Sequence, residues 1–207
     1  MARRLAFLSG RVVEFAQGTD QVQKSAFLYF AYGSNMLAER LQKRCPNARP
    51  LGNAMARGFS LSFSKRSKDG SGKATLVETG ELDEAAYGVL FEVSESEQAK
   101  LDQAEGRRKG YDRDDAFVVI RLTDGKPETA RTYRASPDRC DNGLVPYDWY
   151  HALILAGAFQ HGLPEAYIAE LRRATVQPDP EPQRASRQEA LQILACAGFS
   201  RLVEQGP

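Results

Sequence analysis

Two short segments of this sequence carry residue types that suit the binding and transformation of a small polar molecule. Residues 27–37 (FLYFAYGSNML) run from an apolar strand through a tight polar turn into an amphipathic helix. Such a turn exposes backbone N–H groups that have no partner in strand or helix, and Gly33 leaves room for a ligand beside them. These groups suit an anion or a polarised carbonyl oxygen, so Tyr32, Gly33, Ser34 and Asn35 are predicted to form a binding site.

The second segment, residues 101–106 (LDQAEG), ends a short predicted helix and supplies a carboxylate, Glu105. The backbone dipole disfavours negative charge at the C-terminus of a helix and helps to raise the pKa of a carboxyl group there. A carboxylate tuned in this way can act as a general base near neutral pH, which is the function predicted for Glu105. A solvated residue at the end of a helix is the alternative, and it is the commoner role of a surface Glu.

The hydrophobic pattern predicts the elements that position these two segments. Apolar and polar residues alternate in several runs, which is typical of half-buried strands. The predicted strands are residues 27–31, 59–63, 75–78, 87–93, 117–122 and 129–133. The last two are joined by a hairpin-like turn that contains Asp124 and Gly125.

Helices are predicted after the first strand, where the helix stops before Pro46, and at residues 147–160, 164–174 and 187–196. Pro50 is predicted to close a loop. In the short helix before Glu105, Ser94 and Glu97 form a capping-box pattern and Gly106 ends the helix. The pattern as a whole predicts an α+β fold, a mainly antiparallel sheet or small barrel followed by helices.

Length and composition narrow the class of protein. The 207 residues fit one compact domain, and 28 Lys and Arg balance 27 Asp and Glu, which argues against nucleic acid or an anionic membrane as partner. A small molecule is the predicted partner. Cys45, Cys140 and Cys196 are scattered, which argues against disulfides and zinc and favours the reducing cytoplasm. The two histidines lie ten residues apart, so no metal site is predicted.

Three regions are predicted along the chain. Residues 1–25 lack sustained periodicity and form an N-terminal appendage. Residues 26–176 form the main domain. Residues 177–207 hold a Pro-rich linker and a C-terminal helix that is predicted to pack peripherally or to be mobile.

The chain resembles the γ-glutamylcyclotransferase family in three blocks, which occur in the family's order over about residues 27–175. Residues 27–35 are similar to the family's substrate loop, and residues 101–106 to the segment with its catalytic Glu. Tyr150, followed by Gly157-Ala158 and HGLPEAY at residues 161–167, is similar to its late helical region. The resemblance implies the family's fold, a small mixed, mainly antiparallel β-barrel flanked by helices.

The resemblance also implies a reaction and a set of roles. The substrate's own α-amine attacks its γ-carbonyl, which releases 5-oxoproline and an amine or amino acid without a cofactor or a metal. Glu105 is the implied base, and the N–H groups around Tyr32, Gly33 and Ser34 hold the glutamyl carboxylate or the oxyanion, with Asn35 fixing the turn. The Tyr150 hydroxyl is implied to bind the substrate or Glu105; packing in the core is the alternative role of this aromatic residue.

Other interpretations remain open from the sequence. One is a protein that binds a small ligand at the turn of residues 32–35 and catalyses no reaction. Another is a nucleic-acid or protein interaction module that uses the basic loop at residues 65–73. In that loop the pattern around Lys73 fails as a phosphate loop and predicts a solvated basic loop. Arg107, Arg108 or Arg113 would either pair with a carboxylate on the leaving group or belong to a solvated loop. The exact γ-glutamyl substrate and the oligomeric state stay open, with a homodimer as one option.

Overall fold

The computed structural model describes residues 25–108 and 110–204, so the predicted N-terminal appendage lies outside the described residues except for Ser25. Five strands close into a barrel in the order β1, β5, β2, β6, β7. Neighbouring strands are antiparallel except for β1 and β7, which are parallel. The barrel strands are β1 (Ala26–Ala31), β2 (Arg49–Arg57), β5 (Ala85–Ser94), β6 (Asp112–Arg121) and β7 (Pro127–Arg134). The predicted α+β fold with a small mixed barrel is confirmed.

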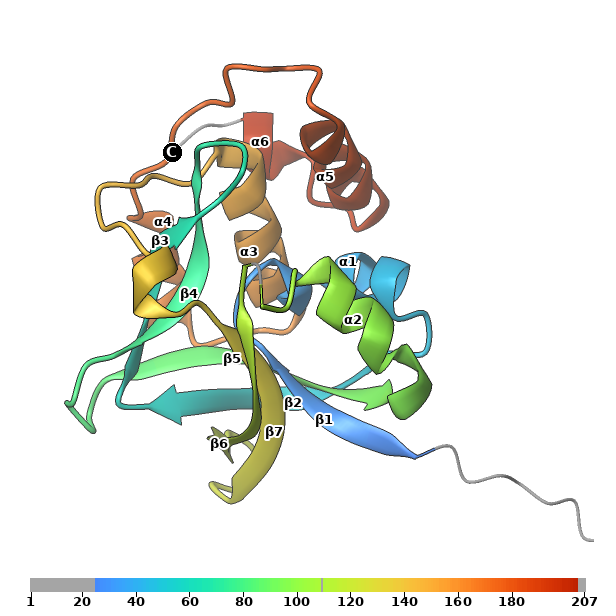
Figure 1. Cartoon of the computed structure of the whole chain (residues 1–207), viewed down its shortest axis with the longest axis vertical. Helices are drawn as coiled ribbons and strands as arrows, with labels where there is room; N and C mark the ends of the chain where they lie inside the picture. Colours follow the sequence, from blue (N-terminus) through green and yellow to red (C-terminus); the bar gives the residue numbers. More distant parts are fainter. Residues whose placement is uncertain (1–24, 109, 205–207) are drawn as a thin grey trace, which may run out of the picture.

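The remaining elements cover one end of the barrel (Figure 1). Strands β3 (Phe59–Arg66) and β4 (Gly72–Glu78) form a separate hairpin. The helices are α1 (Ala38–Arg44), α2 (Gln98–Ala104), α3 (Asp148–Gln160), α4 (Glu165–Arg172), α5 (Ala185–Cys196) and α6 (Arg201–Glu204). Short 3₁₀ helices η1 (Ser34–Met36), η2 (Glu95–Glu97) and η3 (Pro137–Arg139) lie before α1, before α2 and after β7.

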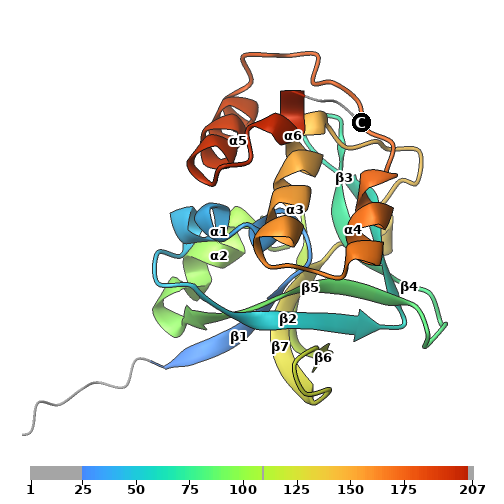
Figure 2. The ribbon, with the colours of Figure 1, turned by 180° about the vertical axis from the view of Figure 1, so that it is seen from behind.

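Helix α3 is the central helix of the covering layer, between α4 and α5 in Figures 1 and 2. Ten consecutive residues, from Trp149 to Ala158, are buried, which is typical of a helix surrounded by protein on all sides. A Cβ atom at Gly157 would lie 2.6 Å from the backbone nitrogen of Leu37 and 2.6 Å from the Cβ of Met36. The glycine therefore lets α3 approach the turn after β1 closely, and this contact fixes where that turn sits.

Strand β1 is pressed closely against β5. A Cβ atom at Gly88 would lie 2.3 Å from the carbonyl oxygen of Ala31, at the end of β1. Inside the barrel the ring of Phe30 stacks on Phe117, with 6.1 Å between the ring centroids. The last residues of β1 are thus held on both sides, directly before the turn at Tyr32.

Strand β2 corrects one prediction, because the loop expected at Pro50 is a strand. Its inward side chains are the fully buried Ala54 and Ala56, whereas Leu51 is exposed, so the residues lack the strong alternation of large apolar side chains. The pairing with β5 is irregular between Pro50 and Gly52. An irregularity at the end of a strand accommodates a residue without an N–H donor.

The predicted capping box is only half formed. The Ser94 hydroxyl accepts a hydrogen bond from the backbone N–H of Ser96 at 3.4 Å. The Glu97 carboxylate does not reach back to Ser94; it is buried and accepts hydrogen bonds from the backbone and side chain of Asn47, at 3.1 and 2.9 Å. A buried carboxylate needs hydrogen-bond donors, and Asn47 supplies two of them. Glu97 therefore links the loop after α1 to the start of α2.

The C-terminal segment packs on α3. Ala190, Ile193 and Leu194 of α5 are buried in the same apolar cluster as α3. The indole N–H of Trp149 donates a hydrogen bond of 2.9 Å to Asp179, which belongs to the Pro-rich segment. The domain boundaries remain a prediction. None of the helices within the described residues is long and apolar enough to cross a membrane.

Candidate functional site

One pocket gathers all the residues that the sequence analysis assigned to a site. It lies where the turn after β1 meets the end of α2, the start of β4 and helix α3. Its lining residues are Tyr29, Tyr32, Gly33, Ser34, Asn35, Ala74, Glu105, Tyr111, Tyr133 and Tyr150. The pocket thus brings together side chains from segments that lie more than 100 residues apart in the chain.

The Glu105 carboxylate is held by two donors. As predicted, Glu105 ends α2, and the following Gly106 adopts a positive φ of 61°. Its Oε1 atom accepts a hydrogen bond of 2.8 Å from Asn35 Nδ2 and one of 2.7 Å from Arg44 Nη1. Its Oε2 atom accepts no hydrogen bond from the described residues, so one oxygen of the carboxylate is available to a ligand.

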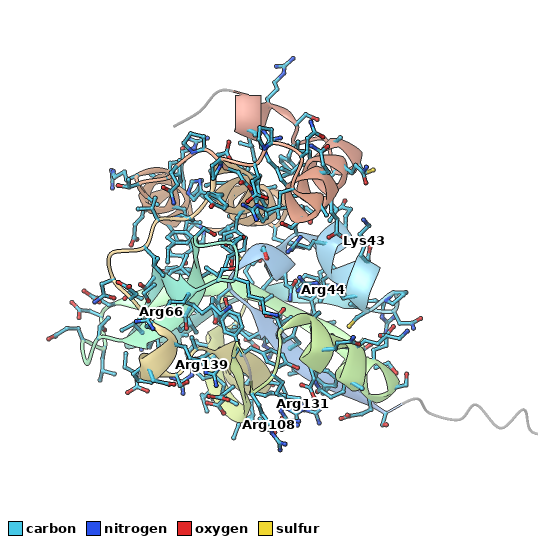
Figure 3. All side chains as sticks on the ribbon, turned by 45° about the horizontal axis from the view of Figure 1, so that its top comes forward. Lys43, Arg44, Arg66, Arg108, Arg131 and Arg139 are labelled. Atoms are coloured by element: carbon cyan, nitrogen blue, oxygen red, sulfur yellow. The ribbon has the colours of Figure 1, made fainter. Side chains whose placement is uncertain are left out.

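Arg44 is the main partner that the sequence analysis missed. It is the last residue of α1, and α1 lies beside α2 in Figures 1 and 2. Its Nη1 atom also donates to Asn35 Oδ1, at 2.8 Å, so Asn35, Arg44 and Glu105 form a closed triangle of hydrogen bonds. Figure 3 shows Arg44 closer to the middle of the molecule than its neighbour Lys43. Because Arg44 pairs with Glu105 and two hydrogen bonds fix its Oε1, the carboxylate is held in one orientation.

The turn residues present the predicted N–H groups to the pocket. Met36 donates its backbone N–H to the carbonyl of Gly33 at 2.9 Å, which closes η1. The N–H groups of Gly33 and Ser34 donate no hydrogen bond to the described residues. The Tyr32 hydroxyl points away from these groups and donates to the carbonyl oxygen of Tyr133. Tyr32 therefore anchors the turn on β7, and the free donors come from the two residues that follow it.

Tyr150 lines the pocket from the first turn of α3, with its side chain buried. Its hydroxyl accepts a hydrogen bond of 3.1 Å from the backbone N–H of Ala74, and burial raises its pKa. No hydrogen bond joins it to Glu105 among the described residues. Lys73 lies 4.5 Å from the centroid of its ring and pairs with Asp69 at 2.9 Å. The prediction of a solvated loop is thus wrong for Lys73, whose buried ammonium packs on the aromatic residues beside the pocket.

Three further tyrosines in the pocket were not predicted, namely Tyr29, Tyr111 and Tyr133. The Tyr29 hydroxyl accepts a hydrogen bond of 3.0 Å from Asn35, and the Tyr111 hydroxyl donates one of 2.8 Å to the carbonyl of Ala74. Burial raises the pKa of both hydroxyls well above the ordinary value, so they stay protonated.

The charged stretch after Glu105 is internally paired. Arg107 and Arg113 both contact the carboxylate of Asp102, at 3.2 and 2.9 Å, and the Tyr133 hydroxyl donates to the same carboxylate at 2.6 Å. Arg108 adopts a positive φ of 66°. Pairing of Arg107 or Arg113 with a carboxylate on the leaving group is therefore not favoured, since Asp102 already engages both guanidinium groups.

The closed mixed barrel with helices over one end is similar to the fold of one class of solved proteins, the γ-glutamyl cyclotransferases. A solved structure titled gamma-glutamyl cyclotransferase is similar to the chain with a TM-score of 0.72 and 27% identity, over 81% of this chain and 99% of that one. A model of the AIG2-like family matches residues 85–171.

Curated relatives make the assignment more specific. The gamma-glutamylcyclotransferase of Bos taurus is 32% identical over 154 residues, which are 70% of this chain and 77% of the relative. That of Homo sapiens is 32% identical over 157 residues, 72% of this chain and 79% of the relative. The chain belongs to the γ-glutamylcyclotransferase family, as the resemblance predicted, and is an enzyme of this type.

Proposed function

We propose that the protein cleaves a γ-glutamyl amide by intramolecular attack of the α-amine on the γ-carbonyl, giving 5-oxoproline and a free amine or amino acid. The observation that carries the proposal is the convergence of one oriented carboxylate, Glu105, and the free N–H groups of Gly33 and Ser34 on a single pocket. A family whose named members are γ-glutamylcyclotransferases supplies the reaction.

Glu105 moves the proton in this proposal. The amine must lose a proton as its nitrogen bonds to the carbonyl carbon, and the departing nitrogen must gain one as the amide bond breaks. The Oε2 atom receives the first proton and returns it to the leaving group, so the reaction consumes no water and no cofactor. Asn35 and Arg44 hold Oε1, at 2.8 and 2.7 Å, and keep Oε2 turned to the substrate.

The turn after β1 binds and orients the substrate. The N–H groups of Gly33 and Ser34 stabilise negative charge on the glutamyl carboxylate or on the oxyanion of the tetrahedral intermediate. Tyr32 and Asn35 hold the turn from either side, through Tyr133 and Glu105. Tyr150 closes the pocket, and its protonated hydroxyl lies within reach of a bound substrate. Orientation accounts for much of the catalysis, because intramolecular ring closures reach effective molarities of about 10⁵ M or more.

Two further proposals concern substrate and location. The sequence of residues 30–35 (FAYGSN) resembles that of the branch of the family that acts on γ-glutamyl amino acids. We therefore propose γ-glutamyl amino acids as substrates ahead of γ-glutamylamines. The cytoplasm is the proposed location, because Cys45, Cys140 and Cys196 are all free thiols.

The test is release of 5-oxoproline from a panel of γ-glutamyl amino acids, glutathione and ε-(γ-glutamyl)-lysine. We expect release from γ-glutamyl amino acids and a loss of roughly 10²- to 10⁴-fold in kcat for Glu105→Gln, the range typical of a removed general base. Glu92→Gln, on the barrel surface, is the matched control and should keep full activity. Full activity in Glu105→Gln would refute its role as base. No 5-oxoproline from any member of the panel would refute the activity.

A further inference from the structure

A second arginine on α1 contacts the turn that lines the pocket. Arg40 precedes Arg44 by four residues, so the two side chains project from the same face of the helix. Its Nε atom donates a hydrogen bond of 3.0 Å to the hydroxyl of Ser34, which lines the pocket. This hydrogen bond holds the guanidinium of Arg40 against Ser34.

Arg40 lacks the counter-charge that Arg44 has. No carboxylate of the described residues lies within ion-pair distance of Arg40, and its hydrogen bond to Ser34 involves a neutral hydroxyl. Burial, and after it the like charge of Arg44, lowers the pKa of Arg40 to about 10. A partly buried cation without a partner is costly, and an anion that binds beside it offsets the cost.

The guanidinium of Arg40 contacts Ser34, one of the two pocket-lining residues whose N–H groups are free. Glu105 and Arg44 compensate each other's charge, so the positive charge of Arg40 remains beside the donors of Gly33 and Ser34. A planar guanidinium with free terminal N–H groups matches a carboxylate in shape and in charge. A γ-glutamyl group has one such carboxylate, bonded to the carbon that also carries the attacking amine.

We propose that Arg40, oriented by Ser34, binds the α-carboxylate of the γ-glutamyl group and thereby selects substrates that carry it. The inference rests on the proposed function and adds the recognition group for the acyl half of the substrate. Because the carboxylate and the amine share one carbon, holding the carboxylate at Arg40 limits the positions of the amine and directs it toward the γ-carbonyl. Arg40 thus contributes to binding and to orientation, whereas proton transfer belongs to Glu105.

The test compares two substrates that differ only in this carboxylate: γ-glutamyl-L-alanine and N-(4-aminobutyryl)-L-alanine. The first gives 5-oxoproline and the second 2-pyrrolidinone, and both release alanine, which is measured. The wild-type enzyme should favour the first substrate in kcat/KM. In Arg40→Gln we expect this preference to shrink by roughly 10- to 100-fold, the effect of losing hydrogen bonds between charged groups, mainly through a higher KM for the first substrate.

Three further variants make the result specific. Lys43→Gln removes an exposed cation from the same helix and should leave the preference unchanged. Arg40→Lys keeps the charge and should restore part of the preference. Ser34→Ala removes the hydroxyl that orients Arg40 and leaves the guanidinium in place, so it should lower the preference and serves as a second test if Arg40→Gln does not fold.

Two results would overturn the inference while leaving the proposed function intact. One is an unchanged preference in Arg40→Gln and Ser34→Ala; the other is an equal loss of activity on both substrates, which is the result of a purely structural role. A wild-type enzyme that releases alanine from neither substrate, and 5-oxoproline from no γ-glutamyl amide, would instead refute the proposed function itself.

Discussion

The contact between Arg44 and Glu105 leads to a prediction that needs no substrate. Arg44→Met removes the hydrogen bond of 2.7 Å to Glu105 and the one of 2.8 Å to Asn35. The side chains of Arg44 and Glu105 are 23% and 14% exposed, so the pair lies between a surface pair, worth about 0–1 kcal/mol, and a buried one, whose disruption costs about 3–5 kcal/mol. We expect Arg44→Met to lower the free energy of unfolding by about 1.5–3 kcal/mol, most of it from the carboxylate left without its partner.

A double-mutant cycle separates this coupling from other effects of the substitutions. Urea unfolding is measured for the wild type, Arg44→Met, Glu105→Gln and the double variant. Glu105→Gln removes the charge that Arg44 neutralises, so the double variant should be more stable than the sum of the single losses by about 1 kcal/mol or more. Losses that add to within about 0.5 kcal/mol would refute the coupling. Without Arg44, Glu105 should adopt other side-chain orientations as well. A folded Arg44→Met variant should therefore also lose about tenfold in kcat for each 1.4 kcal/mol by which these orientations become more favourable than the original one.

Two further predictions concern stability away from the pocket. Asp179→Asn should lower the free energy of unfolding by about 1–3 kcal/mol, because the buried carboxylate accepts hydrogen bonds from Arg184 at 2.8 Å and from Trp149 at 2.9 Å. Since Trp149 is the only tryptophan and bonds the same carboxylate, its fluorescence in urea should report the loss; an unchanged midpoint would contradict the assignment. Burial lowers the pKa of His151 and of His161, so the folded state keeps both neutral while the unfolded state gains protons below about pH 6.5. The contribution of the two histidines to the free energy of unfolding should therefore be constant above that pH. Below it, the free energy of unfolding should fall by up to about 1.4 kcal/mol per pH unit for each histidine. Equal free energies of unfolding at pH 7.5 and pH 5.5 would contradict this prediction.

Local patterns predicted much of the fold. The strands around Phe30 and Phe117, the helix end at Gly106 and the hairpin at Gly125 follow from alternation and turn chemistry, which act over a few residues. Strand β2 was missed because Ala54 and Ala56 point inward and give a weak apolar signal. The order of strands in the barrel depends on pairings between distant segments, which no local pattern encodes.

The candidate site could be predicted from the sequence to a similar degree and for the same reason. Each segment that holds a predicted residue is locally distinctive, and these segments meet in one pocket. The partners of these residues were missed: Arg44 and Arg40 follow the turn motif on an ordinary charged helix, and nothing local distinguishes them from Lys43. Their spacing of four residues was the available signal, because it places two cations on the helix face that continues from the turn.

That spacing also bears on how the pocket handles charge. Two arginines four residues apart repel each other by a few tenths of a kcal/mol on an isolated helix. Arg44 recovers this cost through Glu105 and Asn35, whereas Arg40 has only the Ser34 hydroxyl among the described residues. Pairing Arg40 with Oε2 of Glu105 would instead occupy the oxygen that accepts no hydrogen bond from the other described residues. An α-carboxylate from the substrate compensates Arg40 and leaves Oε2 of Glu105 free, so one ligand group satisfies the binding end of the pocket without blocking the catalytic end.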